Sequence, residues 1–290
     1  MALVENTLFG TEDKVANSIE ALQTFEPKEG YYVAFSGGKD SVVIKKLCDL
    51  AGVKYDAHYS VTSVDPPELV RFIKESYPDV SRDIPHYSDG KPITMWNLIP
   101  KMGVPPTRLM RYCCDKLKEG GGIGRFVVTG VRWAESSRRR ASRGVLDIDD
   151  EEKGRIKFLN NDNDEARAFT ESCFRKKKTI LNPIINWSDE DVWEFIRKYD
   201  VPYCKLYDEG FARLGCIGCP MNRHREDAFK RYPKYKQMYL KAFARMEKER
   251  ERKGLKLYGG AEAVMDWWLD DNSKPDSIIE GQIEMVLEDL

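Results

Sequence analysis

The sequence predicts an α/β fold, in which a doubly wound, mostly parallel sheet is followed by a helical, cysteine-bearing C-terminal part. Short apolar runs at residues 31–35, 54–61 and 125–129 alternate with segments of helical spacing, which is the pattern of βαβ units. A glycine pair separates the first apolar run from the helix after it. With 290 residues, the chain is long enough to bury the core that such a sheet needs.

Helices are expected on either side of these strands. Apolar residues share one helical face over residues 11–25, 42–51, 68–76 and 93–101. A fourth short strand is expected at residues 180–185, and Ser188 is expected to cap a further helix. Residues 145–175 are rich in acidic and amide side chains, which predicts an exposed polar excursion.

The composition limits the classes of function. A net charge of -1 gives no overall attraction to nucleic acid. The first residues lack the basic start and apolar core of a signal peptide, and no apolar run approaches membrane-spanning length. We therefore expect a cytoplasmic protein with no membrane partner. Seven cysteines are too few for a disulfide scaffold of this size, so clustered thiols point to metal binding or chemistry.

The glycine pair belongs to a run of small and polar residues that suits an anion. Two glycines let the backbone approach a phosphate closely, and the start of the following helix favours negative charge. An ordinary turn is the alternative for a lone glycine pair, but the whole run favours phosphate binding. The expected nucleotide-binding residues here are Ser36, Gly37, Gly38, Lys39, Asp40 and Ser41.

Basic side chains follow the strand at residues 125–129. Because ligands of open α/β sheets bind at the carboxyl ends of the strands, we expect Arg132 and Arg138 to lie near the phosphate loop. For the next arginines along the chain, a solvated surface is an equal alternative. A loop at residues 103–118 carries Lys118, which could contact a phosphate or the sulfide of a metal cluster.

Five cysteines have spacings that suggest a metal site. Cys216 and Cys219 form a Cys-x-x-Cys turn flanked by glycines, Cys113 and Cys114 are adjacent, and Cys204 precedes the turn. Any four of these thiolates could complete a 4Fe-4S cluster or a tetrahedral zinc site. Adjacent cysteines are awkward ligands for one zinc ion.

The last part of the chain reverses its charge. Residues 223–256 are basic and contain interleaved tyrosines, whereas the residues that follow are acidic. The basic stretch could bind a nucleic-acid backbone. The alternative, which we favour slightly, is an amphipathic helix that pairs with the acidic stretch within the chain or across a homodimer. The sequence is thus divided into an N-terminal helix (1–29), a nucleotide-binding domain (30–222) and a helical C-terminal region (223–290).

Taken together, the phosphate loop, the Cys113-Cys114 pair and the Cys216-x-x-Cys219 turn resemble the phosphoadenosine phosphosulfate reductase family. This family belongs to the N-type ATP pyrophosphatases, which have an adenine nucleotide alpha hydrolase-like fold. The resemblance runs from about residue 31 to residue 220. It implies that the loop holds the phosphates or sulfate of an adenine nucleotide, and that Cys113, Cys114, Cys216 and Cys219 hold a 4Fe-4S cluster.

One departure affects the branch of the family. True sulfonucleotide reductases use a cysteine near the C-terminus as the nucleophile, and no cysteine follows Cys219 in this sequence. Residues 113–118, 130–136 and 182–193 look more like the DNA phosphorothioation sulfurtransferases and related phage-borne proteins. In that comparison Cys204 replaces Cys114 as a ligand, so both ligand sets stay open.

The resemblance implies an ATP pyrophosphatase that transfers sulfur with the help of a cluster. Its catalytic residues would be Lys39, Asp40, Lys118 and Arg132, and Arg132 and Arg138 would bind the nucleotide by neutralising its α-phosphate. Its cofactors would be ATP, Mg²⁺ and a 4Fe-4S cluster, with zinc as the alternative to the cluster. Its partners would be a sulfur donor or thiol reductant protein and an acceptor, for which nucleic acid is one option. The competing functions are a reductase that uses an external thiol and a non-catalytic nucleotide-binding subunit of a modification or defence complex.

Overall fold

The computed structural model describes residues 3–7, 10–135, 140, 145–148, 179–222 and 225–270. The chain forms two compact units that interleave along the sequence. The first consists of Met1–Val61, Asp65–Pro85 and Leu117–Gly215, and the second of Thr62–Val64, His86–Lys116 and Cys216–Leu290. The units therefore combine distant segments, and the sequence division at residues 29 and 222 stays a prediction.

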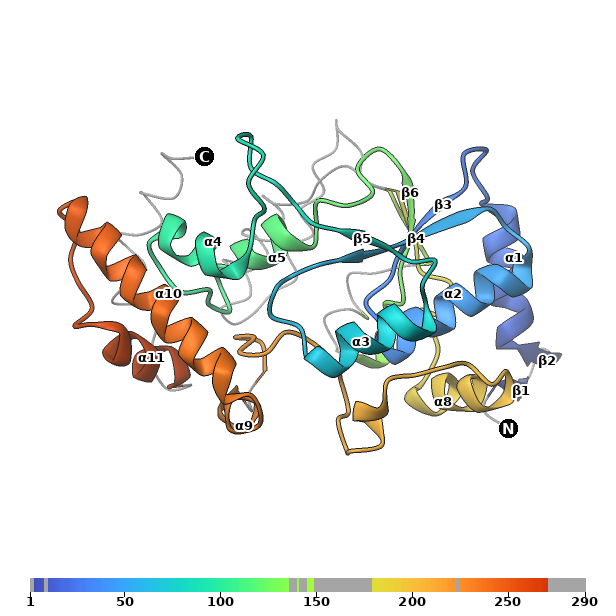
Figure 1. The fold of residues 1–290 in the computed structure, drawn as a ribbon. Helices are drawn as coiled ribbons and strands as arrows, with labels where there is room; N and C mark the ends of the chain where they lie inside the picture. Colours follow the sequence, from blue (N-terminus) through green and yellow to red (C-terminus); the bar gives the residue numbers. More distant parts are fainter. Residues whose placement is uncertain are drawn as a thin grey trace. The chain divides into compact units, whose positions relative to one another are not determined.

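A six-stranded sheet forms the centre of the first unit (Figure 1). In the order in which they pair, its strands are β5 (Ser81–Asp83), β4 (Tyr55–Ser60), β3 (Tyr31–Ala34), β6 (Phe126–Val128), β8 (Thr179–Leu181) and β7 (Leu146–Ile148). The first five strands are parallel, and β7 runs antiparallel to β8 at the edge. The predicted α/β class and the mostly parallel sheet are therefore confirmed.

Two predicted segments differ from the structure in detail. The strand expected at residues 180–185 ends at Leu181, because the chain then turns, with the N–H of Ile185 bonded to the carbonyl of Asn182 (3.2 Å). The start of the expected polar excursion forms strand β7, and residues 149–175 of it lie outside the described residues.

The N-terminal helix is preceded by a hairpin that the sequence analysis did not predict. Strands β1 (Val4–Thr7) and β2 (Gly10–Asp13) pair antiparallel, and α1 (Lys14–Thr24) follows. Asp13 caps this helix by accepting the N–H groups of Val15 (2.9 Å) and Ala16 (3.0 Å), which satisfies two of the free donors of its first turn.

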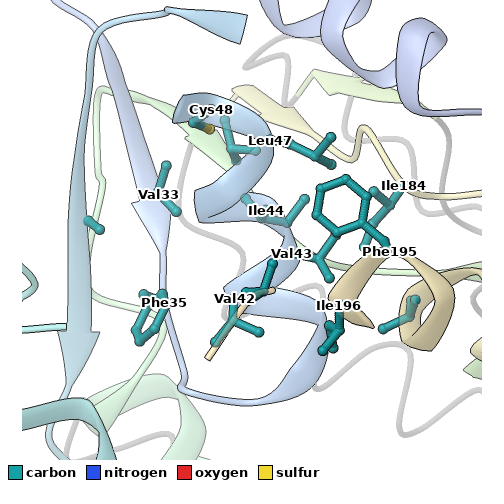
Figure 2. Packing of buried hydrophobic residues seen from close by; sticks show 14 of the residues in the cluster. Val33, Phe35, Val42, Val43, Ile44, Leu47, Cys48, Ile184, Phe195 and Ile196 are labelled. Atoms are coloured by element: carbon teal, nitrogen blue, oxygen red, sulfur yellow. The ribbon is translucent and has the colours of Figure 1, made fainter. Parts of the chain in front are cut away.

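Helix α2 (Lys39–Ala51) lies between the sheet and α8 (Asp189–Lys198), as Figure 2 shows. Val33 and Phe35 pack from the sheet side, while Ile184 and Phe195 pack from the side of α8. Burial of these apolar side chains is the main favourable term that holds α2 in place, and its first residue, Lys39, is thereby fixed at the end of β3. Helix α3 (Pro67–Ser76) turns Leu69 and Ile73 into the core.

The second unit is helical. Its helices are α4 (Met95–Met102), α5 (Tyr112–Leu117), which ends at the boundary with the first unit, α9 (Arg225–Arg231), α10 (Pro233–Arg252) and α11 (Ala261–Leu269). Helix α10 packs against α4, α9 and α11. The predicted basic stretch thus forms α9 and α10, whereas most of the acidic stretch lies outside the described residues. Among the helices that the structure describes, none has both the length and the apolarity that crossing a bilayer requires.

A buried ion pair joins the N-terminal helix to α8. The ammonium of Lys14 lies 2.8 Å from the carboxylate of Asp191, whose side chain is fully buried. We expect Lys14→Ala to lower the free energy of unfolding by about 3–5 kcal/mol, because it leaves a buried charge without its cation. Urea denaturation measures the change. Lys91→Ala, which removes an exposed pair with Asp89, is the control, and equal midpoint shifts for the two variants would contradict this account.

Candidate functional site

The site lies where the strand order of the sheet changes direction. From β3 the chain crosses to β4 on one side, while β6 pairs with β3 on the other. Ligands of open parallel sheets bind outside the carboxyl ends of the strands at such a point. The segments that leave β3 and β6 here are residues 35–38 and 129–132, which include the predicted phosphate loop and Arg132.

The loop after β3 has a backbone that only glycine can follow. Gly37 has a φ of +73°, and a Cβ atom there would lie 2.8 Å from the side chains of Leu69 and Ile73. Ser41 closes the loop by donating its hydroxyl to the carbonyl of Gly38 (2.9 Å). Gly38, the residue before α2, has no side chain that could cap the helix, so the first N–H groups of α2 depend on other partners.

A buried arginine joins three segments at this point. The Nε atom of Arg132 lies 2.7 Å from the carboxylate of Asp40, and an Nη atom lies 2.7 Å from the carboxylate of Asp189. The other Nη atom donates to the carbonyl of Trp187 (3.2 Å). The ammonium of Lys39 lies 3.4 Å from Asp189 and 3.8 Å from Asp40. Two cations and two carboxylates therefore balance each other.

These contacts favour the charged forms of Asp189 and Arg132. Burial by itself would raise the pKa of Asp189, but the charges and hydrogen bonds of Arg132 and Lys39 outweigh it, and the pKa is lowered. Burial likewise opposes the charge of Arg132, and the two carboxylates outweigh it, so that its pKa is raised. Arg132 and Asp189 are thus charged at neutral pH.

A pocket of about 170 Å³ opens above this cluster. Its walls include Ser36, Gly38, Lys39, Asp40 and Ser41 of the loop, Gly130 and Val131 after β6, and four residues that the sequence analysis did not assign to the nucleotide site: Glu135, Tyr207, Arg213 and Leu214.

Two of these missed residues contact each other, and a third contacts the loop. Arg213 pairs with Glu135 (3.0 Å), and the hydroxyl of Tyr207, in the short helix η2 (Lys205–Tyr207), accepts the N–H of Lys39 (2.8 Å). Asp189 was also missed, because its place in the first turn after Ser188 suggested only helix capping. No local motif marks these residues as neighbours of the phosphate loop.

Of the described residues that were predicted for the nucleotide site or its chemistry, Gly37, Arg132 and Lys118 do not line this pocket. Lys118 is exposed. Arg138 lies outside the described residues. Cys204 is 1% exposed and packs within the apolar core of the first unit, where burial raises the pKa of its thiol.

The other four predicted metal ligands belong to the second unit. Cys113 and Cys114 lie in α5, and the N–H of Cys219 donates to the carbonyl of Cys216 (3.2 Å) in a tight turn. Between the last two, Gly218 has a φ of +74°, and a Cβ atom there would lie between 2.8 and 3.1 Å from three aromatic rings. These rings belong to Phe229, Tyr239 and Trp268. The aromatic core of this unit thus holds the turn.

The four thiols are close enough to influence one another. The pKa of Cys113 is raised by its hydrogen bond with Cys114, by burial and by the charges of Cys114, Cys216 and Cys219. An Nη atom of Arg111 lies 3.2 Å from the sulfur of Cys114. Among the residues that the structure describes, no three Cys, His, Asp or Glu side chains are arranged to hold a single metal ion. Thiolates are soft ligands that suit iron–sulfur clusters and zinc.

Several known proteins are similar in sequence to parts of this chain. Two uncharacterised proteins of Methanocaldococcus jannaschii are 27% identical over 192 residues and 26% identical over 208 residues. These matches cover 64% and 67% of this chain but only 40% and 36% of those proteins. The adenosine 5'-phosphosulfate reductase of Bacillus cereus is 22% identical over 219 residues, which are 73% of this chain and 83% of that enzyme.

Two solved structures that match this chain have lower sequence identities to it. The phosphoadenylyl-sulfate reductase from Candida auris, in a phosphate complex, has a TM-score of 0.44 and 17% identity over 69% of this chain and 88% of its own. The FMN adenylyltransferase of Candida glabrata, in complex with FMN and an ATP analog, has a TM-score of 0.44 and 16% identity over 70% of this chain and 63% of its own.

The phosphoadenosine phosphosulfate reductase domain matches residues 30–222, which are well over half of the chain. The match contains the loop at residues 36–41, the buried Arg132 cluster and all four cysteines of the second unit. The chain therefore belongs to the phosphoadenosine phosphosulfate reductase domain family.

Proposed function

We propose that this chain is an ATP pyrophosphatase of the sulfurtransferase type, which binds ATP in the first unit and uses the cysteines of the second unit in sulfur transfer. The observation that carries the proposal is the phosphate loop beside the cluster of Lys39, Asp40, Arg132 and Asp189. A helix N-terminus, two glycines and a cluster of charged side chains at a strand switch point suit a nucleoside triphosphate.

The loop would hold the phosphates of ATP. Backbone N–H groups of Gly37, Gly38 and Lys39 and the hydroxyls of Ser36 and Ser41 would bind the β- and γ-phosphates. Because the cations of the cluster are already balanced by carboxylates, the added negative charge of a triphosphate needs a counter-ion. Mg²⁺ bound by the phosphates near Asp40 would supply it and would stabilise the leaving pyrophosphate.

We propose a role for Arg132 other than direct contact with a phosphate. Its guanidinium is occupied by Asp40, Asp189 and the carbonyl of Trp187. We therefore assign it the role of a positioning residue that orients Asp40 toward the metal. Direct neutralisation of the α-phosphate by Arg132 or Arg138 stays a prediction.

The reaction would proceed in two steps. An oxygen of the acceptor, or of a sulfur carrier, attacks the α-phosphorus of ATP, the bond to the β-phosphate breaks and pyrophosphate leaves. A sulfur nucleophile from a donor protein then attacks the acceptor atom that bears the adenylated oxygen, the bond from that atom to the oxygen breaks, and AMP leaves with the oxygen. Nucleic acid remains one option for the acceptor.

The four cysteines of the second unit are the proposed ligands of a 4Fe-4S cluster. Their mutual influence on the pKa of Cys113 and the contact of Arg111 with Cys114 support this set, because hydrogen bonds to sulfur are part of how proteins tune such clusters. Cys204 packs in the core of the first unit instead. A bound cluster would supply sulfur-binding or electron-transfer chemistry.

A second function competes with this one. The adenosine 5'-phosphosulfate reductase of Bacillus cereus matches this chain over most of its length. The same loop could hold a sulfonucleotide, and a thiol of a partner protein would then attack its sulfur. A chain that only binds the nucleotide for a larger complex is the third function to be tested.

Removing the ammonium of Lys39 tests the nucleotide site. With ATP and Mg²⁺, we expect the native protein to release pyrophosphate in the presence of a sulfur donor. Lys39→Met should weaken ATP binding at least about tenfold, because a pocket cation is lost while both carboxylates remain. Lys46→Met, on the same helix but not in the pocket, is the matched control. Calorimetric titration and a pyrophosphate assay measure the two effects.

The products separate the three functions. Sulfite released from a sulfonucleotide and a thiol, without pyrophosphate from ATP, would establish the reductase. Tight ATP binding with neither product would establish the binding subunit. Equal ATP binding by Lys39→Met and Lys46→Met would contradict the site itself.

Single replacements of two cysteines test the cluster. After anaerobic purification, we expect iron and acid-labile sulfide in the native protein. Cys114→Ser should lose most of both, because it removes one of four ligands, whereas Cys204→Ser should keep them. Iron analysis and the visible absorption spectrum measure the loss. A colourless native protein with one zinc ion per chain would rule out the iron–sulfur cluster, and iron loss only in Cys204→Ser would reverse the ligand assignment.

A further inference from the structure

We propose that the hydroxyl of Tyr207 occupies a phosphate position in the nucleotide-free protein, so that ATP must displace Tyr207 in order to bind. This inference rests on the proposed ATP site, and it adds a residue that controls access to it. No motif in the sequence connects Tyr207 with the phosphate loop, which lies about 170 residues earlier in the chain.

The position of the hydroxyl carries the inference. The N–H of Lys39, the first residue of α2, donates to the Tyr207 oxygen at 2.8 Å. This N–H is one of the donors that a helix N-terminus offers to an anion. Tyr207 also lines the pocket together with Gly38 and Ser41. An oxygen of the protein therefore occupies the place where a phosphate oxygen would bind.

A phosphate oxygen should replace the Tyr207 hydroxyl as the acceptor for the N–H of Lys39. Burial raises the pKa of Tyr207, so its hydroxyl stays neutral. A neutral oxygen accepts a weaker hydrogen bond than a charged phosphate oxygen does. The ammonium of Lys39, 5.9 Å from the centre of the Tyr207 ring, would turn from the ring toward the ligand.

The support of the Tyr207 ring allows this movement. The ring packs edge-on against Trp193, with centroids 5.2 Å apart, and its residue ends the short helix η2. Three residues later, Gly210 has a φ of +91°, where few other residues are tolerated. Tyr207 packs at the edge of the apolar core, and in the proposed movement its side chain leaves the loop while the sheet and α2 stay in place.

Tyr203 provides a matched control. Its ring packs edge-on against the same Trp193, with centroids 5.3 Å apart and the same 82° between the ring planes. Its hydroxyl, however, donates to the carboxylate of Asp208 (2.9 Å) and not to the phosphate loop. Both replacements by phenylalanine keep a ring that can pack against Trp193, and only Tyr207→Phe frees the N–H of Lys39.

The test compares the native protein with Tyr207→Phe and Tyr203→Phe. Calorimetric titration with ATP and Mg²⁺, and separately with inorganic pyrophosphate, should show roughly two- to tenfold tighter binding by Tyr207→Phe, because no internal hydrogen bond must be broken first. Tyr203→Phe should bind like the native protein. Unchanged or weaker binding by Tyr207→Phe would overturn the proposal. Weaker binding would indicate that the Tyr207 hydroxyl donates a hydrogen bond to the bound phosphate.

Amide hydrogen exchange of Lys39 gives a second readout without a nucleotide. Exchange should be several-fold faster in Tyr207→Phe than in the native protein and in Tyr203→Phe. Equal exchange rates in all three would overturn the proposal even if affinities differ. If the native protein binds ATP and Tyr207→Phe binds it no more tightly, only the proposed role of Tyr207 is contradicted. If none of the three proteins binds ATP, the proposed ATP site is contradicted as well.

Discussion

The hydrogen-bonded ion pairs of Arg132 are the interaction on which the proposed nucleotide pocket depends. A guanidinium cannot lose its proton at neutral pH, so its burial requires partners with negative charge. Asp40 supplies one from the first turn of α2, and Asp189 supplies the other from the first turn of α8. One side chain after β6 thereby fixes the starts of two helices, and the phosphate loop lies directly before one of them.

Glycines allow the backbone segments around the proposed sites to lie close to neighbouring side chains. A Cβ atom at Gly130 would lie 2.9 Å from the side chain of Asp40, so a larger residue would push the segment after β6 away from α2 and weaken the Arg132 cluster. Gly37 likewise allows the loop to lie close to Leu69 and Ile73 of α3. In the second unit, Gly218 allows the cysteine turn to lie on aromatic rings. At both proposed sites, the backbone of a glycine thus packs directly against side chains.

The two units divide the proposed chemistry between them. The first holds the phosphate loop, its charges and the Tyr207 hydroxyl, and the second holds four of the five clustered cysteines. Cys204 shows why spacing alone is ambiguous: it lies near the Cys216 turn in the sequence, but its side chain fills the core of the sheet unit. A thiol packed among apolar side chains behaves as a small apolar residue.

The sequence alone was sufficient for the α/β class, for strands β3, β4 and β6, and for the loop at residues 36–41, because apolar periodicity and glycine pairs are local signals. It missed β5, whose residues Ser81–Asp83 are polar, and the hairpin before α1. It also missed Asp189 and Tyr207. Their importance comes from contacts with Arg132 and Lys39 that only the folded chain brings together, since a charge or hydroxyl distant in sequence leaves no local pattern of its own. Tertiary packing likewise decided which cysteines are neighbours, because side-chain burial depends on the whole core.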